Sequence, residues 1–119
     1  MAAFTLYYVD TASGVDSVGN GTSTGASAYA TVQYALNDIG TTHGIGTVGN
    51  QINIKGDDTI TTTLTLATYG APATASPLVF KGYTTTANDG GQGAINGNNS
   101  VAIYQDTAND YVYFVNMRL

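Results

Sequence analysis

Two segments near the start of the chain decide the fold: residues 7–10 read YYVD and residues 29–36 read YATVQYAL. The first segment has the residue types of a short β-strand. A loop rich in Gly, Ser, Thr and Asn follows it. The second segment begins a run of apolar residues at the i, i+3, i+4, i+7 spacing of an amphipathic helix, namely Val32, Ala35, Leu36 and Ile39. Thr31 precedes this run and can cap the helix, because its hydroxyl can accept a hydrogen bond from a first-turn amide.

Downstream of the helix the sequence predicts strands. Short apolar segments recur at intervals of roughly 20–30 residues, which is the range of repeat architectures. They are residues 52–54, 78–80, 101–103 and 112–114. Residues 59–68 alternate apolar side chains with threonines, which predicts a further strand. One helix before a series of short strands is typical of an all-β protein.

The composition excludes several function classes. Charged residues make up 9% of the 119 residues, and the formal net charge is −5. The only basic residues are Lys55, Lys81 and Arg118, which are dispersed along the sequence. Binding to nucleic acid or to an anionic membrane surface requires clustered Lys and Arg, so neither partner is expected. The absence of cysteine excludes disulfides and thiolate metal sites. The first residues lack the features of a secretion signal, and the localisation stays open between a virion and the extracellular space.

Several segments resemble the N-terminal portion of right-handed parallel β-helix proteins of the pectate-lyase-like superfamily. These are YVD at residues 8–10, GVDS at 14–17, the helical segment 29–36, and the coil-like segments 51–56, 77–83 and 111–119. The resemblance implies an all-β fold, a short right-handed parallel β-helix (β-solenoid) with one N-terminal capping α-helix. It also implies a single domain over residues 1–119, with strand, loop and capping helix in 1–50 and coils in 51–119.

The resemblance implies less about function, because the superfamily includes polysaccharide lyases, hydrolases, phage tailspikes and other virion proteins. No catalytic motif of the family can be carried over residue by residue, so no catalytic residue is predicted. The weaker alternative is a catalytic pair for hydrolysis, which needs two carboxylates about 5–9 Å apart. Such a pair would be formed by Asp106 with Asp110 or Asp89.

The acidic residues are better explained by turn chemistry than by metal binding. A Ca²⁺ ion needs six to eight converging oxygens, and the candidates for such a site are Asp57, Asp58, Asp106 and Asp110. The same two explanations, turn chemistry and a cation site, apply to a second oxygen-rich group, which consists of Asp10, Asp16, Asn20 and Thr22. His43 is expected to be a solvated loop residue rather than a metal ligand or part of a triad. No cofactor is predicted.

The tyrosines indicate an interface. Tyr supplies flat apolar area together with a hydroxyl, which suits protein contacts and, as an alternative, sugar contacts. The candidate interface residues lie near the end of the sequence and are Tyr111, Tyr113, Met117 and Leu119. The unpaired edge of a β-structure is normally covered, so self-association as a trimer or an end-to-end assembly is expected.

The sequence thus predicts a non-catalytic structural module that self-associates, of the kind found in phage capsids or tails. The alternative is the N-terminal part of a polysaccharide lyase or hydrolase, or a glycan-binding β-helix.

Overall fold

The computed structural model describes residues 4–43, 49–66, 70, 72–103 and 111–119. In chain order its elements are β1 (Thr5–Asp10), the 3-10 turn η1 (Gly25–Ser27), α1 (Val32–Asp38), the π-helical turn η2 (Ile39–His43), β2 (Asn50–Lys55), β3 (Asp57–Thr59), β4 (Leu78–Tyr83), β5 (Gly93–Asn96), β6 (Val112–Val115) and β7 (Met117–Arg118).

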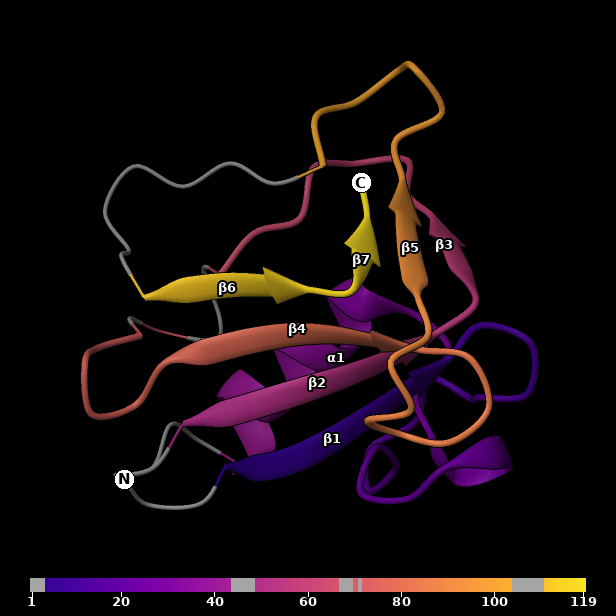
Figure 1. The fold of residues 1–119 in the computed structure, drawn as a ribbon. Coiled ribbons are helices and arrows are strands. Elements are labelled where there is room, and N and C mark those ends of the chain that lie inside the picture. The colour runs from indigo at the N-terminus through magenta and orange to yellow at the C-terminus, as the bar shows by residue number, and fades with distance from the viewer. Residues whose placement is uncertain (1–3, 44–48, 67–69, 71, 104–110) are drawn as a thin grey trace.

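The described strands form two parallel sheets (Figure 1). The larger sheet has the strand order β1-β2-β4-β6, and the smaller sheet has the order β3-β5-β7. In the larger sheet Tyr7 lies beside Ile52, and Ile52 lies beside Phe80. Phe80 in turn lies beside Phe114. The register therefore places apolar side chains in a row that crosses the sheet on its inner face.

Two residues with a left-handed backbone turn the chain from the larger sheet into the smaller one. Gly56 has φ 91° between β2 and β3, and Asn116 has φ 53° between β6 and β7. Glycine takes this conformation without steric cost, and asparagine visits it more readily than most other residues. These two short corners place β3 and β7 in the smaller sheet directly after β2 and β6.

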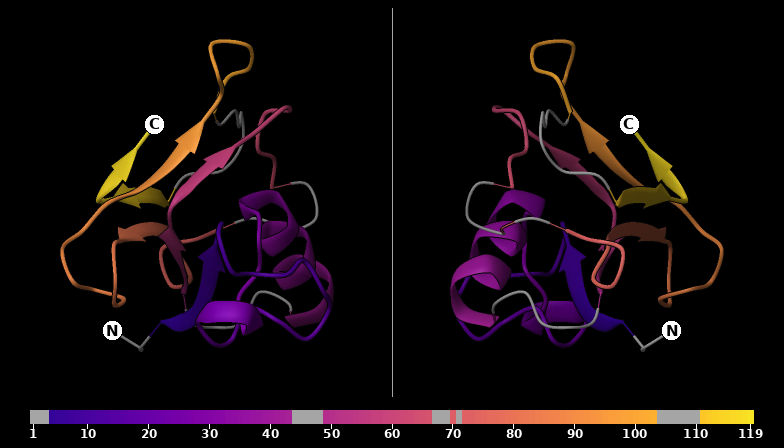
Figure 2. Two further views of the ribbon diagram at one scale, coloured as in Figure 1. Left: turned by 90° about the vertical axis from the view of Figure 1, so that its right-hand side faces the viewer. Right: turned by 90° about the vertical axis from the view of Figure 1, so that its left-hand side faces the viewer.

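Helix α1 lies at the β1 end of the larger sheet, behind β1 and β2 in Figure 1 and to one side of both sheets in Figure 2. The apolar residues of α1 and of the turn after it are fully buried, and they are Val32, Ala35, Leu36 and Ile39. They share one core with side chains from both sheets and from the segment after β3, including Ile52, Ile54, Leu64, Phe80 and Ile95. The Thr31 hydroxyl accepts a hydrogen bond from the Tyr34 amide at 3.3 Å, which caps the helix.

The fold class expected from the sequence, an all-β right-handed parallel β-helix with a capping helix, is wrong. The chain is a small compact domain of α/β type, and its described residues form seven strands in two parallel sheets and one α-helix. The apolar residues of the helix are part of the same core as side chains from both sheets. The extents of the domain are 31 × 30 × 27 Å, which makes it compact in all three directions.

Two predicted strands also differ from the structure. Of the strand predicted over residues 59–68, only Thr59, the last residue of β3, belongs to a strand among the described residues 59–66, and residues 67 and 68 lie outside the described part. Residues 101–103 form bends instead of the strand expected over 101–105, whose last two positions lie outside the described residues. The Ile60 N–H donates to the Asn96 carbonyl at 2.8 Å and the Leu64 N–H to the Ile103 carbonyl at 3.2 Å. Among the described residues these bonds stay separate and do not form a continuous ladder.

A Gly82→Ala substitution is expected to disrupt the corner where the two sheets meet. A Cβ atom at Gly82 would overlap the Asn116 carbonyl oxygen and the Gly93 amide nitrogen, which are backbone atoms that cannot rotate away. We expect the free energy of unfolding to fall by roughly 3 kcal/mol or more, measured by urea denaturation.

Gly90→Ala is the control, because Gly90 has φ 79° but nothing within 4 Å of the added Cβ atom. It should lose only about 1 kcal/mol through backbone strain. Equal losses in the two variants would contradict the proposed crowding at Gly82.

Candidate functional site

The outer edge of β1 is closed by the loop that precedes α1. The Tyr8 N–H donates to the Gly21 carbonyl at 2.8 Å, and the Tyr29 N–H donates to the Tyr8 carbonyl at 3.0 Å. The Asp10 N–H donates to the Tyr29 carbonyl at 2.9 Å. Backbone groups that an edge strand would offer to another chain are therefore used within the domain.

Asp10 holds the beginning of this loop at the end of β1. Its Oδ1 atom accepts hydrogen bonds from the amides of Ala12 and Ser13, both at 3.0 Å. Its Oδ2 atom lies 3.5 Å from Lys55 Nζ. Burial of Asp10 favours the neutral form, but the two amides and the Lys55 ammonium outweigh it and lower the pKa of this carboxyl.

Asp16 and Asn20 hold the rest of the loop. Asp16 Oδ1 accepts from the amides of Ala30 and Thr31 at 2.8 and 3.0 Å, and Asn20 Nδ2 donates to the Val15 carbonyl at 2.9 Å. The oxygen-rich loop identified in the sequence thus uses its side chains to satisfy backbone groups, as turn chemistry predicts. Its role is to keep the β1 edge covered.

The outer edge of the smaller sheet is β3, which is short and acidic. The pleat separates its two carboxylates: Asp57 is exposed, whereas Asp58 is buried and its Oδ2 accepts from the Val32 amide at 2.8 Å. Burial raises the pKa of Asp58, and the nearby charges of Asp16 and Asp57 add to this, while the Val32 amide opposes it. A short edge strand with charged residues is a poor template for another strand.

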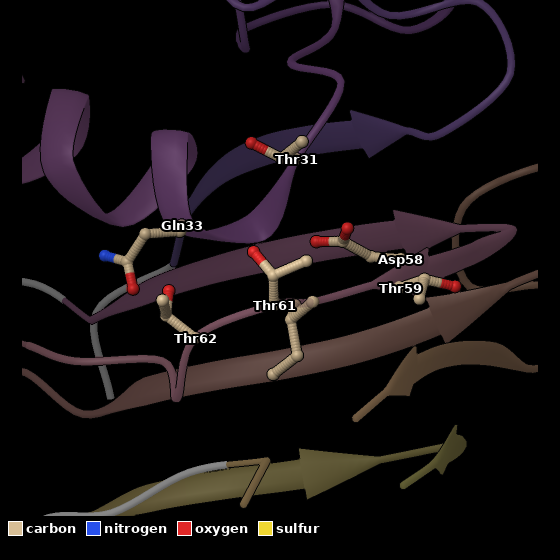
Figure 3. A pocket seen from close by; sticks show the side chains of 7 residues that line it. Thr31, Gln33, Asp58, Thr59, Thr61 and Thr62 are labelled. Atoms are coloured by element: carbon tan, nitrogen blue, oxygen red, sulfur yellow. The ribbon is translucent and has the colours of Figure 1, made fainter. Parts of the chain in front are cut away.

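A polar hollow of about 160 Å³ lies between the first turn of α1 and the segment after β3 (Figure 3). It is lined by Thr31, Gln33, Asp58, Thr59, Ile60, Thr61 and Thr62. Gln33 already bonds Thr65, whose amide donates to Oε1 at 3.0 Å, and Thr31 donates to Asp16 at 2.8 Å. The lining contains a single carboxyl group and no cationic side chain, so it offers no pair of groups for acid–base chemistry.

A buried carboxylate network lies at the C-terminal end of α1. Asp38 is 4% exposed, and it accepts hydrogen bonds from the Tyr29 hydroxyl at 2.6 Å and from the Thr42 hydroxyl at 2.7 Å. His43 Nε2 lies 3.7 Å from the same carboxylate, and the His43 ring packs against Tyr7 with ring centroids 5.3 Å apart. The network joins β1, the loop and the end of α1.

Sequence reasoning did not find this network. His43 was expected to be a solvated loop residue; its side chain is 25% exposed but lies next to the buried Asp38. The available signal was position: Asp38 is three residues after Ala35, at the border of the apolar helical stripe. An acidic residue at that border points toward the core and needs donors there.

The remaining edge is formed by β6 and β7. β6 pairs with β4 on one side, and no other described strand pairs with it. Large apolar side chains here are exposed to between 39% and 61%, and they are Tyr111, Tyr113, Val115 and Leu119. On the opposite face Val112 and Phe114 are half-buried, and the Phe114 ring stacks on Phe80 with centroids 4.9 Å apart. This edge carries apolar surface at the place where a further strand would fit.

The predicted site residues are therefore distributed over the domain. Tyr111, Tyr113 and Leu119 lie together and exposed on the β6–β7 edge, with Met117 half-buried beside them. Asp57 and Asp58 lie on β3, and the predicted partners Asp106 and Asp110 lie outside the described residues. Within the described part of the chain, no three acidic or histidine side chains converge as metal ligands would.

An Asp58→Asn substitution is expected to stabilise the protein at neutral pH. The amide oxygen can still accept from Val32, while the buried charge beside Asp16 and Asp57 is removed. Because the folded-state pKa of Asp58 is raised, ionisation of this group costs stability above the unfolded pKa of about 3.9. The gain in the free energy of unfolding should therefore be largest near pH 7 and vanish below about pH 4.

Urea denaturation across this pH range measures the effect, with the exposed neighbour Asp57→Asn as the control. A loss of stability in Asp58→Asn at pH 7 would show that attraction to the α1 amides exceeds the cost of burial.

A Tyr29→Phe substitution is expected to destabilise the protein by about 1–3 kcal/mol, because it removes a short hydrogen bond to a buried carboxylate. Burial and the Asp38 carboxylate raise the pKa of Tyr29 far above its usual range. The stabilisation is complete below the unfolded pKa of about 10 and decreases as the pH rises above it. The variant should therefore lose less stability between neutral and alkaline pH than the wild type does.

Tyr34→Phe is the matched control, because the Tyr34 ring lies 5.7 Å from the Tyr29 ring. Thermal denaturation at several pH values distinguishes the two. The same alkaline profile in Tyr29→Phe and wild type would contradict the role of the Tyr29–Asp38 bond.

Comparisons with protein-family models, with curated proteins and with solved structures give no match. None of the described helices is long and apolar enough to cross a membrane. The resemblance to the pectate-lyase-like superfamily therefore stays a prediction, and function has to be argued from the geometry of the domain.

Proposed function

We propose that the protein is a non-catalytic assembly module that self-associates through the β6–β7 edge. The observation that carries this proposal is the contrast between the edges of the two sheets. The β1 edge is closed by loop hydrogen bonds, and the β3 edge is short and acidic. The β6–β7 edge carries exposed apolar side chains, and residues 111–117 contain no charged side chain.

The residue types on this edge suit a protein partner. Residues 111–117 read YVYFVNM and contain no charged side chain, in a chain with a net charge of −5. Natural edge strands usually carry a charge, a proline or a bulge that prevents pairing. Burial of one exposed Tyr or Val side chain contributes roughly 1.5–3 kcal/mol, so a few of them per copy support association.

The alternative functions have weaker support. Asp10, Asp16 and Asp89 accept hydrogen bonds from backbone amides, which assigns these carboxylates to turns rather than to substrate. The carbohydrate-related function and the placement in a virion stay predictions from the sequence.

A Val115→Asp substitution tests the proposal. Val115 lies in register with Lys81 of β4, so a carboxylate is tolerated within one copy. In an association through β6 this carboxylate would lose its water against the second copy, at a cost that the isolated chain does not have. We expect the dissociation constant to rise roughly ten-fold or more, measured by sedimentation equilibrium.

Val18→Asp is the control, because Val18 is 68% exposed in the loop before α1 and far from β6 in the fold. This variant should associate like the wild type. A wild type that stays monomeric up to high micromolar concentration would overturn the proposal.

A further inference from the structure

Independently of the proposed self-association, we infer that the hollow between α1 and the segment after β3 binds a primary ammonium group, with Asp58 as its carboxylate partner. The ammonium group is carried on a short aliphatic stem, as in a small alkylamine or a lysine side chain. The site is separate from the β6–β7 edge, because none of the described residues that line it lies in β6 or β7.

The carboxylate of Asp58 has one oxygen available to a ligand. Asp58 is 7% exposed, and its Oδ2 atom accepts a hydrogen bond from the Val32 amide at 2.8 Å. The Oδ1 atom has no hydrogen-bond partner among the described residues, and the side chain lines the hollow (Figure 3). A largely buried carboxylate oxygen without a donor is unfavourable. The hollow therefore presents a strong acceptor that a ligand with N–H donors can satisfy.

The other polar groups of the lining suit the same ligand. The hydroxyls of Thr59, Thr61 and Thr62 have no hydrogen-bond partner in the described part of the chain, so their oxygens can accept from a ligand. Thr31 and Gln33 already bond other residues and form a fixed rim. An ammonium group carries three N–H donors and no acceptor. It can therefore bond the carboxylate oxygen and hydroxyl oxygens at the same time.

The size and one wall of the hollow suit an aliphatic stem. Its volume is about 160 Å³, whereas one water needs only roughly 10–15 Å³. Ile60 lines the hollow, so methylene groups next to the ammonium can pack on its side chain while the charged head stays at Asp58. A Ca²⁺ ion fits less well, because it takes six to eight oxygen ligands and the described lining has a single carboxylate.

The local charge selects a cation over a neutral ligand. No cationic side chain is among the described residues of the lining. Burial and the nearby charges of Asp16 and Asp57 raise the pKa of Asp58, which means that its ionised form is unfavourable in the domain without a ligand. An ammonium group at Asp58 supplies the opposite charge and removes this cost, whereas a neutral hydroxyl leaves the repulsion among the carboxylates unchanged.

Titration with n-butylammonium chloride at constant ionic strength tests the inference, with the backbone amides followed by NMR. We expect saturable shifts at Val32, whose amide donates to Asp58, and at residues 59–62. The dissociation constant should be on the order of 1 mM. Tetramethylammonium has the same charge but no N–H donor, and it should bind roughly ten-fold more weakly or worse.

Two variants separate contact with Asp58 from the general effect of charge. Asp58→Asn should weaken binding of n-butylammonium by roughly ten-fold or more, while urea denaturation shows a protein at least as stable as the wild type. Asp57→Asn is the matched control, because it removes the same charge from the exposed neighbour and should weaken binding by no more than about three-fold. Thr61→Val removes a hydroxyl at an exposed position without altering the core, and it should weaken binding by roughly three-fold.

Several results would overturn the inference. They are equal affinity in Asp58→Asn and Asp57→Asn, tighter binding of Ca²⁺ than of n-butylammonium at the same amides, and a wild type without saturable shifts up to about 100 mM. A capped lysine, N-acetyl-lysine methylamide, identifies the carrier. Tighter binding than that of n-butylammonium assigns a lysine side chain, equal or weaker binding assigns a small amine, and both support the ammonium group. None of these measurements depends on the mass of the protein in solution, so their failure leaves the proposed self-association intact.

Discussion

The parallel register of the larger sheet is the constraint on which the rest of the structure depends. It places Tyr7, Ile52 and Phe80 in one row on the inner face, and the row ends at Phe114. Ile52 and Phe80 have a paired strand on each side, and they are fully buried in the core that they share with α1. Phe114 has a strand on one side only among the described residues, and it is half-buried. The ordered core and the apolar edge are therefore two consequences of the same register.

Local structure could be predicted from the sequence to the extent that periodicity determines it. Alternation over residues 52–54, 78–80 and 112–114 corresponds to β2, β4 and β6, and the helical spacing corresponds to α1. The division into two sheets could not be predicted, because it depends on left-handed corners at Gly56 and Asn116 and on pairing between distant strands. The fold class was wrong for a related reason: burial of the α1 stripe in the common core is a tertiary property, and the spacing alone does not distinguish a core helix from a capping helix.

The candidate site was partly accessible to sequence reasoning. Tyr111 and Tyr113 alternate with Val112 and Phe114, and this pattern alone predicts one exposed aromatic face. The protection of the β1 edge could not be predicted from the sequence. It consists of backbone bonds such as that from the Tyr8 amide to the Gly21 carbonyl, and the composition of a loop does not specify which carbonyl an amide will bond. Asp38 was missed because its donors become apparent only when the loop, the helix and η2 are folded together.

Several acidic residues hold loops in place, whereas none lies in the strand β6. All eight acidic residues are Asp, whose short side chain reaches amides two to five positions away and so ties turns. Asp89 accepts from the amides of Thr84, Thr85, Thr86 and Gly91, and these bonds lower the pKa of its carboxyl far below its usual range. Asp10 bonds nearby amides in the same way, whereas Asp16 accepts from the amides of Ala30 and Thr31 farther along the chain. Residues 112–115 of β6 carry no charge, so the proposed contact through this strand would bury no carboxylate of the strand itself.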